Sequence, residues 1–142
     1  MKSIYPQLNI KIKSILDGVA KIKKVYSYPA TKIDAYPAAI FYPANTDNSF
    51  ENTKENFKTY GYKLWIVVNA NGTNVETIFS SVMPGVMDAV MEAIDKEWSF
   101  NTIDGHRVWC SFSTGAWGVS ENNNSIEITA EINLNIKMLT SN

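Results

Sequence analysis

The segment 126–138 alternates apolar and polar residues without an exception. The apolar positions are Ile126, Ile128, Ala130, Ile132, Leu134, Ile136 and Met138, and the polar ones are Glu127, Thr129, Glu131, Asn133, Asn135 and Lys137. Side chains of a β-strand point alternately to opposite faces of a sheet, so the pattern predicts a strand with one face on a core and the other in water. Other elements must therefore form a layer that covers the apolar face.

Two amphipathic helices are predicted, and they can supply that layer. The first spans residues 3–17, with apolar residues at helical spacing on one side, and Gly18 ends it. The second covers residues 74–98, and its apolar stripe comprises Val75, Ile78, Phe79, Val82, Val86, Val90 and Ala93. Proline lacks the N–H that a helix needs, so we expect a kink or two successive helices at Pro84 and Gly85.

The remaining apolar segments predict strands. Two short ones lie at 25–28 and 38–42, and the second has a proline on either side. A longer strand, 57–69, is apolar on both faces at its far end and is expected in the centre of the sheet. Residues 106–112 are expected to form a further strand, which the segment from Gly115 to Gly118 bends. The order α-β-β-β-α-β-β predicts one α+β domain, 1–142, with a largely antiparallel (mixed) sheet of about five strands and two helices packed on one face.

Composition excludes several classes of function. Thirteen Lys and Arg residues against fourteen Asp and Glu residues give a net charge of −1, which is not the basic surface that a nucleic-acid binder needs. The single cysteine, Cys110, cannot form a disulfide within the chain and fits a reducing compartment. No run approaches the ~20 apolar residues of a membrane span. We therefore expect a soluble domain that takes neither a membrane nor a specific nucleic-acid sequence as its partner.

No pattern of residues indicates catalysis. The chain lacks the phosphate-binding, dinucleotide-binding, nucleophile-elbow and zinc-protease motifs. His106, the one histidine, is four residues from Cys110, which in a strand separates them by about 13 Å, too far for a nucleophile and its base. Glu127 and Glu131 have the same spacing, beyond the carboxylate separation of glycosidases. We expect no catalytic residue, no metal site and no cofactor.

Two features favour contacts with other proteins. The polar stretch 44–56 predicts either a loop that docks on a partner or a floppy hairpin tip, and its candidate contact residues are Asp47, Phe50, Glu51, Lys54 and Glu55. The second feature is a surplus of large apolar side chains, which oligomer contacts commonly bury. They are the row Met87, Met91 and Trp98 on the second helix, and Trp117 between two glycines.

The parts also follow one another in a recognisable order. A short helix that ends at a glycine leads to a strand, then to Tyr-Pro-Ala-Ala-Ile (36–40) and a closing Pro43. The polar loop, an aromatic-rich strand (60–69) and a long helix of the type V-x2-IF-x2-VM come next, before a Trp-bearing strand and the alternating strand. This layout resembles the tail-terminator, or tail-completion, proteins of long-tailed bacteriophages and phage-like particles. The resemblance covers nearly the whole chain, as an order of elements.

The resemblance implies a structural protein of the virion, and not an enzyme. Members of the family assemble as a ring, typically a hexamer, on the head-proximal end of the tail tube, where they end tube polymerisation and join the tail to the head. The implied partners are further copies of the chain, the tail tube protein and a head-completion or connector protein. The implied location is the tail neck, assembled in the bacterial cytoplasm. The alternatives are another phage neck or minor tail protein, or an α+β module that binds a small apolar ligand between sheet and helices.

Overall fold

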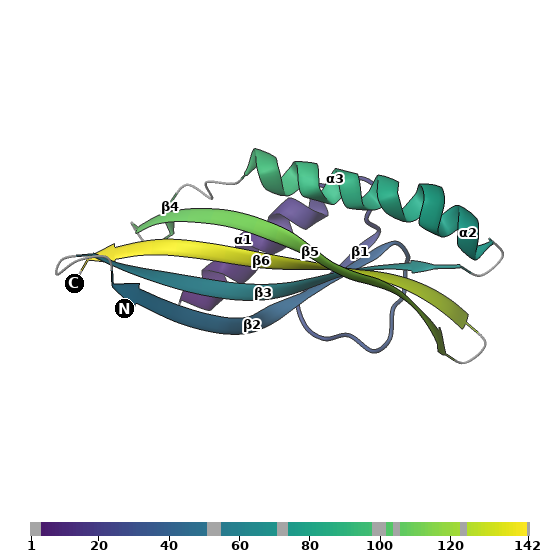
Figure 1. Cartoon of the computed structure of the whole chain (residues 1–142), viewed down its shortest axis with the longest axis horizontal. Coiled ribbons are helices and arrows are strands. Elements are labelled where there is room, and N and C mark those ends of the chain that lie inside the picture. The colour runs from purple at the N-terminus through teal and green to yellow at the C-terminus, as the bar shows by residue number, and fades with distance from the viewer. Residues whose placement is uncertain are drawn as a thin grey trace.

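The computed structural model describes residues 4–50, 55–70, 74–97, 102–103, 106–122 and 125–141. Its centre is a sheet with the strand order β1-β2-β3-β6-β5-β4 (Figure 1). The strands are β1 (Lys24–Tyr26), β2 (Ala38–Phe50), β3 (Glu55–Asn69), β4 (Thr102–Ile103), β5 (His106–Asn122) and β6 (Ser125–Ser141). β1 pairs with β2 in parallel, and the other neighbouring pairs are antiparallel. The predicted α+β fold with a mixed, largely antiparallel sheet is confirmed, and the two-residue β4 is an addition at one edge.

β3 and β6 form the middle of the sheet, as predicted for the long aromatic-rich strand. They pair along their length, from Glu55 opposite Ser141 to Asn69 opposite Glu127. The apolar positions of β6 between residues 128 and 138 are at most 3% exposed. The alternating segment therefore faces the core with its apolar side, as its period of two predicts.

Helices cover one face of this sheet. α1 (Ile4–Asp17) buries Leu8, Ile12 and Leu16. The second helical run consists of α2 (Val75–Thr77), the π-helical turn η1 (Ile78–Val82) and α3 (Met83–Lys96). The buried residues of α3 are Met83, Val86, Met87, Val90 and Ile94. They belong to one hydrophobic core with α1 and with the inward residues of β2, β3, β5 and β6, so helices and sheet form two packed layers (Figure 1).

The run Val75–Lys96 is long and apolar enough to cross a membrane, which the sequence analysis did not expect. In this fold, however, its apolar side packs on the sheet, where Val86, Val90 and Ile94 are buried. A long apolar helix with one face against a sheet is the pattern of a core helix in a globular domain.

The irregularity before Pro84 is a π-helical turn, and the helix continues through it. The Met83 N–H bonds to the Ile78 carbonyl oxygen, five residues back. Pro84 then stands in the first turn of α3, where its missing N–H costs little. The helical run is therefore continuous over Val75–Lys96. Its predicted start is confirmed, because the Asn74 Oδ1 accepts a backbone N–H of the first turn at 3.0 Å.

Residues 44–56, predicted to be a polar loop, lie largely in strands. β2 continues to Phe50, β3 begins at Glu55, and the register between them shifts once, between Pro43 and Asn45. The prediction ended the strand at the proline because proline cannot donate to a sheet ladder. Prolines are nevertheless accepted in edge strands and at bulges, and Pro43 lies at both.

The face of the sheet opposite the helices has a small apolar cluster of its own. Tyr26, Ala38, Ile40 and Val67 are buried there. The segment 27–37, which links β1 to β2 and passes below the sheet in Figure 1, contributes half-buried residues to this cluster. Elsewhere, this face carries the alternate, polar residues of β6 and β3.

Candidate interaction surfaces

Cys110 and His106, which a catalytic site could have used, both lie on β5. Cys110 lies on β5 opposite Ile136, in the core, and burial raises the pKa of its thiol to about 12. A thiol that stays protonated is a poor nucleophile and a poor metal ligand. His106 begins the same strand and pairs with Ile103. Among the described residues, no group of three His, Cys, Asp or Glu side chains could hold a metal ion.

The two carboxylates on the polar side of β6 have separate partners. Glu127 accepts a hydrogen bond from the Tyr36 hydroxyl, and burial, together with this carboxylate, raises the pKa of Tyr36 to about 12. Glu131 accepts hydrogen bonds from Lys63 Nζ at 3.1 Å and from Asn133 Nδ2 at 3.2 Å. These contacts link neighbouring strands and attach the segment 27–37 to the sheet.

The predicted apolar row on the second helix divides between core and surface. Met87 is 1% exposed and packs in the core of its own chain. Met91 is half-buried against that core, and Trp98 lies outside the described residues. Met87 therefore has no surface to offer to a partner.

Trp117 lies on β5 beyond a bulge, on the helix side of the sheet. Its side chain is 37% exposed, and its ring centroid is 6.2 Å from that of Phe79. Val119, two residues further along, is 54% exposed. The two residues form an apolar patch at the outer end of β5, and the sequence analysis singled out Trp117 only.

The residues of the polar stretch 44–56 are placed by backbone pairing. Asp47 pairs with Thr59, Phe50 pairs with Asn56, and Glu55 starts β3 opposite Ser141. Glu51 and Lys54 lie outside the described residues. The stretch is therefore the distal part of a long β2–β3 hairpin.

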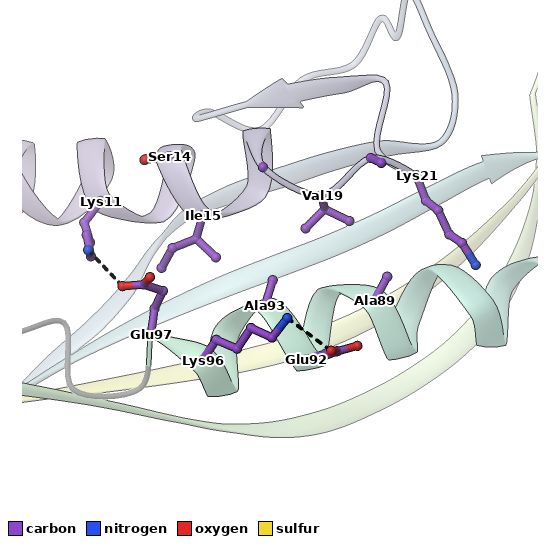
Figure 2. Close-up of a pocket in the computed structure, with 12 residues that line it drawn as sticks. Lys11, Ser14, Ile15, Val19, Lys21, Ala89, Glu92, Ala93, Lys96 and Glu97 are labelled. Carbon is purple, nitrogen blue, oxygen red and sulfur yellow. Dashed lines mark hydrogen bonds and ion pairs between the residues drawn. The ribbon is translucent and has the colours of Figure 1, made fainter.

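A groove of about 510 Å³ runs between α1 and α3 (Figure 2). Small and apolar side chains line its centre, and charged ones stand at its rim: Ser14, Ile15, Val19, Ala89 and Ala93 in the first group, and Lys11, Lys21, Glu92, Lys96 and Glu97 in the second. Two ion pairs cross or border it, Lys11 with Glu97 at 3.2 Å and Lys96 with Glu92 at 3.3 Å.

The described residues of the helices and the sheet line a small cavity between the two layers. The cavity between them, lined by residues such as Ile12, Leu64 and Ile94, measures about 10 Å³. Ligand sites in proteins occupy about 300–1,000 Å³. A second, open pocket of about 330 Å³ lies on the opposite face of the sheet beside Trp65 and Glu127.

The short strands at the two ends of the sheet, β1 and β4, pair with only part of β2 and β5 in the described residues. In the described part of the chain, β1 pairs with β2 at residues 38–40, and β4 pairs with β5 at residues 106–107. Among the described strands, none pairs with the outer edge of β2 over 41–50. These pairings are not evident from the sequence, because they join segments that are distant along the chain.

No protein-family model matches this chain, and no curated protein matches it in sequence.

Proposed function

We propose that this chain is a tail-terminator-type structural protein of a phage or phage-like particle. It forms a ring on the head-proximal end of the tail tube, ends tube polymerisation and presents a surface to the head connector. It acts through matched surfaces and transforms no substrate. The observation that carries the proposal is the one-sided architecture: helices cover one face of the sheet, and among the described strands none pairs with the outer edge of β2 over 41–50.

The order of elements supports the proposal, since it is the order on which the resemblance to tail terminators rests. The chemistry of the candidate residues supports it as well. Cys110 is held in the core with a raised pKa, and the carboxylates of Glu127 and Glu131 are engaged by neighbouring side chains. Because these groups make contacts within the fold, we assign the surfaces around them to contacts with other proteins.

A module that binds a small apolar ligand between sheet and helices is the weaker alternative. Its ligand would need space between the two layers, and the cavity that Ile12, Leu64 and Ile94 line there, about 10 Å³, holds no more than one water molecule. Another neck or minor tail protein would use the same kind of surface, and its position on the tail distinguishes it.

Reconstitution with the tail tube protein of the same particle tests the proposal. Purified chain is added to polymerising tube protein, and tube length is measured by electron microscopy. We expect shorter tubes of narrow length distribution, with a ring-shaped density at one end. Tubes that grow equally long with and without the chain would overturn the proposal.

A matched pair of variants separates a surface effect from loss of fold. Deletion of residues 46–54 shortens the β2–β3 hairpin, and we expect it to abolish capping while the core stays folded. Lys13→Ala removes an exposed ion pair with Asp17 on α1, which is worth less than about 1 kcal/mol. We expect this control to cap tubes as the parent does.

A further inference from the structure

We propose that the open pocket on the face of the sheet opposite the helices binds an arginine side chain of a partner protein. The pocket measures about 330 Å³ and lies where the segment 27–37 passes over this face (Figure 1). The residues that line it are Ala30, Thr31, Ile33, Ile40, Trp65, Val67, Glu127 and Thr129. This inference concerns a binding site, and it does not depend on the tail-terminator proposal.

Strand pairing arranges the floor of the pocket in rows. Trp65 pairs with Ile40 in one row, and Val67 pairs with Thr129 in the next. Glu127 lies one row further, two residues before Thr129 on β6. The rows of Trp65 and Glu127 are thus four residues apart along the strands, which corresponds to about 13 Å. The pocket therefore has an apolar end at Trp65 and an acidic end at Glu127.

The apolar end offers aromatic and aliphatic surface. The Trp65 indole N–H donates to the Tyr42 hydroxyl at 3.0 Å, so the polar edge of the ring already has a partner. Ile33 of the linking segment and Val67 of β3 add aliphatic surface. Alkyl stems of long side chains pack well on surface of this kind while their polar heads reach further.

Glu127 supplies the charge of the pocket. It is half-buried, and it is the one charged residue among the described residues that line the pocket. The Tyr36 hydroxyl donates to its carboxylate, but no Lys or Arg in the described part of the chain forms an ion pair with it. Glu131, on the same face of β6, is instead paired with Lys63 at 3.1 Å. A half-buried carboxylate without a counter-ion favours a cationic partner.

Arginine suits these surroundings better than lysine. Its guanidinium is less strongly hydrated than an ammonium group, packs on aromatic rings and carries five N–H donors. The pocket offers matching acceptors in the Glu127 carboxylate and in the hydroxyls of Thr31 and Thr129. A carboxylate has about four acceptor sites, so the bond from Tyr36 leaves room for a guanidinium. The methylene groups of the arginine stem then pack over Val67, toward Trp65.

The charges of the pocket favour an arginine within a protein over the free amino acid. Free arginine carries an α-carboxylate, which needs a cation or several N–H donors, and no Lys or Arg is among the described residues that line the pocket. In a polypeptide this carboxylate is replaced by a peptide bond. A volume of about 330 Å³ is near the lower end of ligand sites and suits one side chain with part of its backbone. The occupant is therefore an arginine that protrudes from the surface of a partner.

An NMR titration of the full chain tests the site. The probe is acetyl-arginine methylamide, which presents the side chain between two peptide bonds, and its control is acetyl-citrulline methylamide, the neutral isostere. The signal is the indole N–H resonance of Trp65, assigned by its loss in Trp65→Phe. The indole N–H of Trp117, which lies beside Phe79 on the helix side, is the internal reference. We expect a saturable shift of the Trp65 signal with the arginine probe and none with the citrulline probe.

A matched pair of substitutions on β6 isolates the contribution of the carboxylate. Glu127→Gln removes the charge and keeps an oxygen that can accept from the Tyr36 hydroxyl. We expect it to weaken binding of the arginine probe about tenfold. Glu131→Gln makes the same change on the same face, outside the residues that line the pocket, and we expect it to leave binding unchanged. If Glu127→Gln disturbs the fold, the comparison of arginine and citrulline on the parent chain still decides.

Several results would overturn the inference. They are the absence of a Trp65 shift with the arginine probe, equal shifts with the citrulline probe, and arginine binding that Glu127→Gln leaves unchanged. Tighter binding of free L-arginine than of the capped probe would assign the pocket to a small molecule and would also contradict a partner's side chain. Because the titration uses the isolated chain, its result is separate from that of the tube-capping experiment.

Discussion

Met87 and Met91 are the same residue type one helical turn apart on α3, and the structure gives them different surroundings. Met87 is 1% exposed, whereas Met91 is half-buried at the edge of the core. Truncation of a buried methionine to alanine removes about 2 kcal/mol of transfer free energy, and the unfilled cavity adds to the loss. We expect Met87→Ala to lower the free energy of unfolding by about 3 kcal/mol and Met91→Ala to lower it by about 1 kcal/mol.

Thermal unfolding followed by circular dichroism measures the difference. An unfolding entropy of about 2.1 cal/mol/K per residue amounts to about 0.3 kcal/mol/K for 142 residues. Met87→Ala should therefore lower Tm by about 10 °C and Met91→Ala by about 3 °C. The variants are compared at one protein concentration, because assembly of copies would raise Tm. Equal shifts, or a larger shift for Met91→Ala, would refute the assignment of Met87 to the core.

Three other contacts give predictions of the same kind. Burial raises the pKa of the Cys110 thiol to about 12, so we expect mass spectrometry to find it unmodified by an alkylating reagent at weakly alkaline pH in the native protein and fully modified in denaturant. The pKa of Tyr36 is raised from 10.0 to about 12. Because the unfolded chain loses this proton at a lower pH than the folded chain, the free energy of unfolding falls between these two pH values. We expect Tyr36→Phe to reduce that fall, as measured by urea titrations. Gly115→Ala would bring a methyl group to 2.5 Å from Glu131 Oε1. We expect calorimetry to show that this lowers the free energy of unfolding by about 1–2 kcal/mol.

Opposite results would contradict the surroundings assigned to Cys110, Tyr36 and Gly115. Native alkylation of Cys110 as fast as that of a free thiol would contradict its burial. An alkaline stability curve that Tyr36→Phe leaves unchanged would contradict the raised pKa of its hydroxyl. A Gly115→Ala variant as stable as the parent would show that the Glu131 side chain moves aside without cost.

The parts of the fold with a local periodic signal were predictable from the sequence. The alternation in 126–138 predicts that one face of a strand is buried, and β6 is buried on that face. The second helical run was predictable for a similar reason, since its apolar stripe recurs at helical spacing, and α3 buries Val86 and Val90 of that stripe. Such signals depend on neighbours a few residues apart.

The distal half of β2 was not predictable in this way. Its residues 45–50 are mostly polar, and what holds them in a strand is backbone pairing with β3. A strand of this kind requires no apolar alternation, and Pro43 suggested an end where the chain has a bulge. The prediction of a loop was therefore wrong for a physical reason: the pairing partner is distant in sequence.

The candidate surfaces show the same division. Met87 and Met91 belong to one row in the sequence, because helical spacing alone does not tell which part of a broad apolar face another layer covers. The points at which β1 and β4 stop pairing with β2 and β5 were not predictable, because three-residue and two-residue strands leave almost no trace in a sequence. Trp117 was identified because a large apolar residue beside glycines is unusual.

The length of tails in particles made with and without this chain tests the proposed function most directly. Electron microscopy gives the length distribution and the fraction of tails that are joined to heads. Without the chain we expect tubes of variable and excessive length that lack heads, and we expect wild-type protein to restore both properties. Tails of normal, uniform length on filled heads in its absence would contradict the proposal.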